Sequence, residues 1–337
     1  MGLTILYEVG MKRIAQDIKN GQFSKVYLLY GEEAYLRRQY RDNLINALVA
    51  QEDAMNCSIY TGKDINVNEV VDMAGTMPFF AERRVIVVEN SGWFKEGNDK
   101  IIDLVKTLPD TTCLIFVEEE TDKRTKLYKA CTTNGYAAMC AVQDEATLQK
   151  WVMGLLKKEG KRITPDALNL LLDKTGTSME IIRREVEKLV CYKYYDEGIT
   201  AADVEELCIV QLQNKIFDMV EAVAQKDQKT ALALYYSLLA LKEAPMKILA
   251  LIARQFNMLL QVKEMKQKGY QEKEIASQTG LNGYYLKKKY IPQAAQFKQA
   301  VLVDALKACV EADERIKTGH MVDRLSVELI IVQLSQR

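Results

Sequence analysis

The chain has 337 residues, about twice the length of a typical domain, which predicts two or three domains. Its 46 basic and 46 acidic side chains balance, so no global field selects nucleic acid or an anionic membrane. The single histidine, His320, excludes histidine-rich metal sites and His–carboxylate relays elsewhere in the chain. The seven scattered cysteines contain no C-x-x-C pair, which argues against a zinc site or a disulfide framework and suits a reducing cytosol.

The N-terminal stretch becomes amphipathic too early for a signal peptide, and no apolar run approaches the roughly 18 residues of a membrane span. We therefore expect a soluble cytoplasmic protein without a membrane partner.

Residues 1–142 alternate strand-like and helix-like stretches. Short apolar runs predict strands at 25–30, 57–60, 84–88, 112–117 and 137–141. Helical periodicity appears before the first run, at 14–20, and between later runs, at 34–50, 66–74 and 101–108. Strands that alternate with helices predict a parallel sheet that is mostly covered on both faces.

The strand signal disappears after about residue 143, and the rest of the chain is predicted to be helical. Shorter helices at 144–159, 165–175, 178–195 and 200–208 precede a region of longer helices that begins near residue 212. The net charge also changes, from −3 over 1–142 and −3 over 143–211 to +6 over 212–337. We therefore predict three domains: an α/β domain at 1–142 and all-α domains at 143–211 and 212–337.

The loop after the first strand lacks the residues that hold a nucleotide phosphate. A phosphate-binding loop needs several glycines, a lysine and a Ser/Thr, whereas this segment reads Gly31-Glu-Glu-Ala-Tyr-Leu-Arg-Arg38. Its two carboxylates would repel a triphosphate. Acidic residues also end two strands, at Glu89 and at Glu118–Glu120, and we interpret them as solvated strand ends rather than Mg²⁺ ligands.

Four segments together resemble the delta subunit family of bacterial DNA polymerase III. In chain order they are Val26-Tyr-Leu-Leu-Tyr-Gly-Glu-Glu33, Pro78-Phe-Phe-Ala-Glu-Arg-Arg-Val-Ile-Val-Val-Glu-Asn90, Ile182-Arg-Arg-Glu-Val-Glu-Lys-Leu189 and Ala312-Asp-Glu-Arg-Ile-Lys-Thr-Gly319. The resemblance implies an AAA+-like α/β domain without ATPase residues, then a helical lid at 143–211 and a helical collar at 212–337.

The resemblance also implies a function in DNA replication. It identifies a non-catalytic clamp-loader subunit, located at the replisome on the nucleoid, which binds and opens the beta sliding clamp. Its expected partners are that clamp, the delta prime and gamma/tau subunits, and primed DNA within the complex. We expect no catalytic residue, bound nucleotide, cofactor or metal in this chain.

Members of this family hold the clamp with an apolar pair just before the third strand, and here that pair is Phe79-Phe80. Gly75 and Pro78 disfavour continuation of the preceding helix, so a short turn can push apolar side chains outward. We predict Met77, Phe79 and Phe80 as the clamp-binding residues, with Arg83 and Arg84 at the rim. The alternative is that the phenylalanines belong to the core.

Two further segments allow more than one interpretation. Lys287, Lys288 and Lys289 lie between Tyr285 and Tyr290 and are candidate DNA contacts, although a helix with a solvated lysine face over packed tyrosines is the favoured interpretation. Trp93-Phe94 is either a second exposed patch in a loop or a pair folded back onto the sheet.

Two other functions stay open at the level of sequence. One is an ATPase with an atypical phosphate site. The other is a helical nucleic-acid adaptor that uses the basic C-terminal segment.

Overall fold

The computed structural model describes residues 12–49, 54–208, 212–281 and 283–336. By internal packing these residues divide into two compact units. The first lies within Met1–Leu168 and Thr177–Ala202, and the second within Asn169–Gly176 and Asp203–Arg337. The predicted three-domain boundaries at 142 and 211 stay a prediction.

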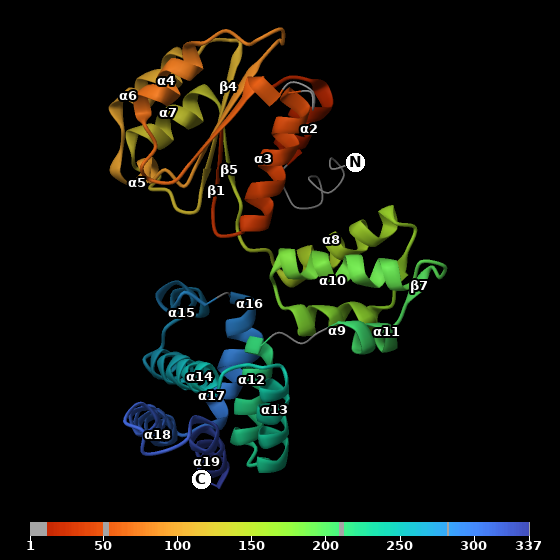
Figure 1. Ribbon diagram of the computed structural model, residues 1–337, viewed down its shortest axis with the longest axis vertical. Helices are drawn as coiled ribbons and strands as arrows, with labels where there is room; N and C mark the ends of the chain where they lie inside the picture. Colours follow the sequence, from red (N-terminus) through yellow and green to blue (C-terminus); the bar gives the residue numbers. More distant parts are fainter. Residues whose placement is uncertain (1–11, 50–53, 209–211, 282, 337) are drawn as a thin grey trace. The chain divides into compact units, whose positions relative to one another are not determined.

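A five-stranded parallel sheet forms the centre of the α/β part (Figure 1). Its spatial order is β2-β3-β4-β1-β5, and every neighbouring pair is parallel. The three central strands are buried along almost their whole length, as expected for a sheet covered on both faces. All five predicted strands are confirmed: β1 (Val26–Tyr30), β2 (Cys57–Thr61), β3 (Arg84–Glu89), β4 (Thr112–Glu118) and β5 (Tyr136–Met139).

Helices cover the two faces of this sheet (Figure 1). One face carries α2 (Lys12–Asn20) and α3 (Ala34–Leu48), and the other carries α4 (Val67–Gly75), α5 (Trp93–Glu96), α6 (Asp99–Thr107) and α7 (Lys126–Asn134). Trp93 and Phe94 begin α5 and are buried in the core of the second face, so the exposed-patch interpretation of this pair is wrong.

The segment after β5 contains short helices and one feature that the sequence did not reveal. The helices are α8 (Glu145–Lys158), α9 (Pro165–Thr175), α10 (Met179–Tyr192) and α11 (Ala201–Leu207). Between them, β6 (Arg162–Ile163) pairs in parallel with β7 (Gly198–Ile199). The expectation that no strand follows residue 143 is therefore wrong, because two-residue strands are too short to show a period of two.

The described residues from 212 onward are helical throughout. Their core surrounds the long helix α14 (Pro245–Gln267), whose buried face includes Ile248, Ile252, Phe256 and Leu259. Among the described helices, none has the length and apolar character needed to cross a bilayer. The elements are α12 (Leu212–Ala224), α13 (Gln228–Ala240), α14 (Pro245–Gln267), α15 (Glu272–Thr279), α16 (Gly283–Tyr285), the π-helical turn η2 (Leu286–Tyr290), α17 (Ile291–Gln296), α18 (Gln299–Lys317) and α19 (Asp323–Gln336).

Candidate protein-binding site

The loop between α4 and β3 carries a group of exposed apolar side chains. Helix α4 ends at Gly75, and the backbone then turns before β3 begins at Arg84. The exposed fractions are 74% for Met77, 53% for Phe79 and 92% for Phe80. The two phenyl rings meet edge to face with centroids 4.6 Å apart. The core alternative for both phenylalanines is therefore wrong, and the three side chains lie where a partner can reach them.

The buried side chain of Asn56 forms hydrogen bonds with the backbone of this loop. This residue lies in the 3₁₀ turn η1 (Ala54–Asn56), immediately before β2. Its carboxamide accepts a hydrogen bond from the Phe79 N–H at 2.7 Å and donates one to the Phe79 carbonyl at 2.8 Å. A single buried amide therefore pairs with both polar backbone groups of Phe79, which fixes the loop at the aromatic pair.

Arg84 was also predicted at the rim, and that prediction is wrong, because its side chain is buried and binds the start of the same loop. This first residue of β3 is buried, and its guanidinium donates hydrogen bonds to the carbonyls of Thr76 at 3.2 Å and Met77 at 3.2 Å. A longer contact, 3.5 Å, reaches the carbonyl of Met55, which joins the loop to η1. The fork of N–H groups on arginine suits this arrangement, because one side chain satisfies several carbonyls that have no helical partner.

Met55 and Ile59 are two further exposed apolar side chains of this unit, and neither was predicted as a site residue. Both side chains are mostly exposed, on η1 and on the edge strand β2. The signal that could have revealed Ile59 is its place on an edge strand of mixed exposure, whereas the central strands are buried runs.

Phe80 adopts a backbone conformation that is unfavourable for a side chain of its size. Its φ is +49°, in the left-handed region that glycine and asparagine occupy most readily. Such conformations cost about 1–3 kcal/mol and persist only where the surrounding structure imposes them. The hydrogen bonds to the neighbouring Phe79 from Asn56 supply that restraint.

Arg83, predicted at the rim, is half-buried. Its guanidinium lies over the ring of Phe23, 5.7 Å from the ring centroid. This cation–π contact directs the charge toward the segment before β1.

At the position of a phosphate-binding loop, the N-terminus of α3 is capped by the protein itself. The Glu33 carboxylate accepts a hydrogen bond from the Tyr35 N–H at 3.1 Å. Burial raises the pKa of Glu33, opposed by that hydrogen bond and by the nearby Arg37. Gly31 lies against β5 so closely that a Cβ there would be 2.5 Å from the Cys140 carbonyl oxygen. A carboxylate therefore takes the place where a nucleotide phosphate would accept from the helix amides.

The acidic strand ends are partly buried, so their interpretation as solvated groups is wrong for two of them. Glu89 forms an ion pair with Arg41. Glu118 is buried and accepts hydrogen bonds from the Ser91 N–H at 2.9 Å and the Ser91 hydroxyl at 2.5 Å. Burial raises the pKa of Glu118, and the Ser91 donors oppose that shift. These two carboxylates stabilise the C-terminal ends of β3 and β4 and the start of α5. Glu119 and Glu120, by contrast, are exposed.

The three candidate DNA-contacting lysines differ in their surroundings. Lys287 is exposed, and Lys288 is exposed with its ammonium 3.1 Å from the Asp173 carboxylate. Lys289 is half-buried over the rings of Phe217 and Tyr285, and burial lowers its pKa. Only the first two therefore present their charge to solvent. Among the described residues, no group of three or more His, Cys, Asp or Glu side chains is arranged to hold a metal ion.

The first unit thus contains a parallel α/β domain in which a carboxylate of the chain itself, Glu33, caps the helix that follows the first strand. Two family models match the chain. Residues 27–140 match the model for the DNA polymerase III delta subunit, and residues 213–334 match the model for the C-terminal domain of that subunit. The chain belongs to the family of DNA polymerase III delta subunits.

Individual relatives agree with this assignment. The chain is 29% identical to DNA polymerase III subunit delta of Bacillus subtilis in an alignment of 335 residues that covers 96% of this chain and 96% of that one. It is 22% identical over 279 residues to the probable DNA polymerase III subunit delta of Aquifex aeolicus, covering 79% of this chain and 78% of that one. The solved structure of the Bacillus subtilis DNA clamp loader delta protein matches with a TM-score of 0.78 at 27% identity, over 96% of this chain and 99% of that one.

Proposed function

We propose that this chain binds and opens the beta sliding clamp with the loop that presents Met77, Phe79 and Phe80. The observation that carries the proposal is the exposed aromatic pair on a loop whose backbone is fixed by Asn56 and Arg84. Soluble proteins usually bury such side chains, and a contiguous exposed apolar group marks an interaction site. The family assignment supplies the partner.

The energetics of this loop suit a binding hot spot. A buried aromatic side chain removes roughly 150–250 Å² from water, and a few such anchors carry most of the affinity of an interface. Because hydrogen bonds already fix the Phe79 backbone, binding does not have to order it again, which lowers the entropic cost of association.

Opening requires no bond to be made or broken by this chain. If the loop binds the open clamp more tightly than the closed clamp, it shifts the population toward the open form by the ratio of the two affinities. ATP bound by the sibling gamma/tau subunits would then control access to the loop. Residues 212–337 would assemble with those subunits and with delta prime, and Lys287 and Lys288 are the exposed candidates for contact with primed DNA.

The decisive experiment measures binding of the purified chain to the beta clamp from the same organism. The test variant is Phe79→Ala/Phe80→Ala. The matched control is Tyr194→Ala/Tyr195→Ala, because that pair is also exposed and also packs edge to face, with centroids 5.0 Å apart. We expect the test variant to lose about 100-fold or more in affinity and the control to bind like wild type.

Equal binding by wild type and both variants would place the contact elsewhere on the chain. Absence of clamp binding by the folded wild-type chain would overturn the proposed function itself. Thermal unfolding of each variant separates lost contacts from lost structure.

The same proposal implies that the chain does not bind ATP. The support for this is the Glu33 carboxylate at the N-terminus of α3 and the single glycine in the preceding loop. Equilibrium dialysis with Mg²⁺-ATP tests it, and stoichiometric nucleotide binding would favour the ATPase alternative.

A further inference from the structure

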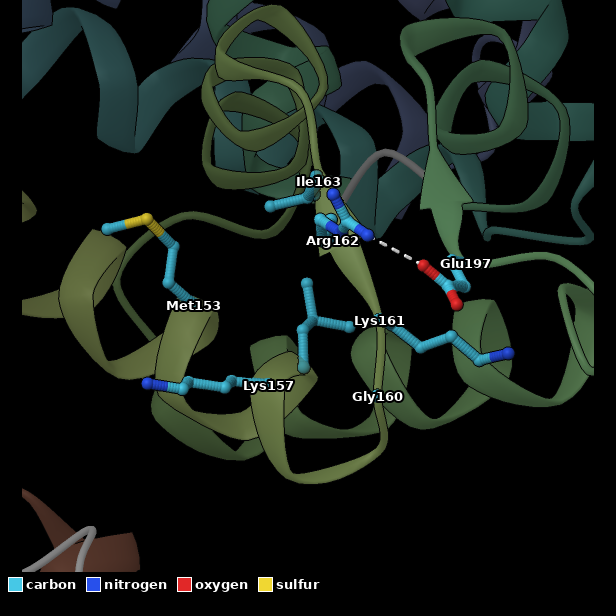
Figure 2. A pocket seen from close by; sticks show the side chains of 8 residues that line it. Met153, Lys157, Gly160, Lys161, Arg162, Ile163 and Glu197 are labelled. Atoms are coloured by element: carbon cyan, nitrogen blue, oxygen red, sulfur yellow. Dashed lines mark hydrogen bonds and ion pairs between the residues drawn. The ribbon is translucent and has the colours of Figure 1, made fainter.

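An open pocket of about 580 Å³ lies in the first unit between helix α8 and strand β6 (Figure 2). Pockets of this size accommodate ligands or peptide side chains. It is separate in sequence from the Met77–Phe80 loop. The residues that line it are Met153, Leu156, Lys157, Gly160, Lys161, Arg162, Ile163 and Glu197.

The floor of the pocket is apolar. Met153 and Leu156 come from α8, and Ile163 comes from β6 on the other side. Leu156 is buried, whereas Met153 is nearly half exposed although it is large and apolar. A methionine side chain is flexible and polarizable and adapts to different apolar partners. The floor is thus suited to an apolar side chain and not to a small polar metabolite.

The Lys161 ammonium stabilises the wall of the pocket through hydrogen bonds to the backbone, so it is not available to bind a ligand. This ammonium donates to the carbonyls of Lys193 at 2.7 Å, Tyr194 at 2.9 Å and Asp196 at 2.8 Å. The three N–H donors of a lysine are thereby engaged. This anchors the turn before β6 to the segment before β7, so the pocket exists before any partner binds.

The charges available at the rim are mainly positive. Lys157 is exposed in the last turn of α8, and Figure 2 shows it beside Met153. Arg162 pairs with Glu197 at 2.8 Å, but both side chains are largely exposed, so this pair is weak and Arg162 can exchange its partner. A carboxylate at the rim would be attracted by both cations.

Strand β6 adds backbone groups to the same place. The N–H groups of Arg162 and Thr164 donate to the carbonyls of Glu197 at 2.7 Å and Ile199 at 3.1 Å on the β7 side. Because successive residues of a strand direct their backbone groups to opposite edges, the N–H and carbonyl of Ile163 point away from β7. An extended chain placed there could pair as an added strand.

From these features we propose that the pocket docks an extended acidic peptide segment of a partner protein. One large apolar side chain of the peptide enters the space over Met153, Leu156 and Ile163. Carboxylates on either side of it contact Lys157 and Arg162, and the peptide main chain runs along β6. An open, apolar pocket beside a strand edge fits a peptide better than a small molecule, because small-molecule sites enclose most of their ligand.

The test uses the full chain and two pools of short fluorescent peptides. Both pools carry a central Leu, Ile, Phe or Met. The first has Glu or Asp two positions away, and the second has Lys in the same place. Fluorescence polarisation reports binding. We expect the acidic pool to bind and the lysine pool to bind at least about tenfold more weakly. No binding by the acidic pool, or equal binding by the two, overturns the proposal.

Two variants locate the binding. Met153→Glu places a charge on the apolar floor and should abolish binding, while Lys157→Glu should weaken the acidic pool about tenfold and strengthen the lysine pool. Lys158→Glu is the matched control, because this neighbouring lysine does not line the pocket. If both test variants still bind the acidic pool like wild type, the peptide binds elsewhere on the chain and the proposal is overturned. Binding of all variants to the beta clamp reports folding independently, since that contact is proposed at a different loop.

Discussion

Asn56 provides the sharpest test of how the aromatic loop is held. Replacing it with alanine removes the two hydrogen bonds to the Phe79 backbone. At about 1 kcal/mol for each bond, the loop loses about 2 kcal/mol of local stability, which corresponds to roughly thirtyfold more frequent opening. We therefore expect Asn56→Ala to raise the hydrogen–deuterium exchange rate of the Phe79 amide by about that factor.

The same variant should weaken clamp binding although it leaves Met77, Phe79 and Phe80 in place, because the freed loop must be ordered on binding. Asn134→Ala is the control, since that exposed asparagine only donates to a carbonyl within α7. Unchanged exchange at Phe79 in Asn56→Ala would refute the view that this amide fixes the loop. Faster exchange with unchanged clamp affinity would refute the link between loop order and binding.

Three further substitutions have expected outcomes. Arg84→Met should lower the free energy of unfolding by about 2–4 kcal/mol in urea titrations, because carbonyls of the loop lose a charged donor; an unchanged midpoint would contradict this. Glu118 has a raised pKa, so its contribution to stability is present below the ordinary carboxyl pKa and is lost as pH rises through the raised value. The Glu118→Gln variant keeps an acceptor for both Ser91 donors but cannot ionise. Its free energy of unfolding should therefore vary less with pH than that of the wild type over this range. Identical pH profiles for the two proteins would show that ionisation of Glu118 does not affect stability. If Lys287 contacts a phosphate in the assembled loader, Lys287→Ala should reduce the salt slope of DNA binding by about 1, whereas an unchanged slope would remove it from the interface.

The parts of the fold that the sequence predicts well are those that depend on local pattern. The strands at 84–89 and 112–118 are runs of buried apolar residues, and Asn66 caps α4 by accepting a hydrogen bond from the Asn68 N–H. Pro165 begins α9 and Gly319 takes a left-handed conformation just after α18, as expected for these residue types.

The errors concern residues whose state depends on distant partners. Glu118 is buried because Ser91, 27 residues earlier, donates to it, and no local pattern announces that contact. Asn56 and Arg84 look like ordinary polar residues at strand starts, yet both are buried under the aromatic loop. Helix α7, between β4 and β5, was not predicted, and only two of its side chains, Leu127 and Cys131, are buried. The exposure of Phe79 and Phe80 was expected from the family resemblance, since composition alone favours neither location.

Stability and binding favour different residues at position 80, because Phe80 has a left-handed backbone conformation. Glycine would adopt this backbone without strain and would remove a phenyl ring from water. A selection for thermostability alone, with no requirement for a partner, should therefore replace Phe80 with glycine or asparagine. Retention of phenylalanine under such a selection would show that the surrounding loop, rather than binding, dictates the residue.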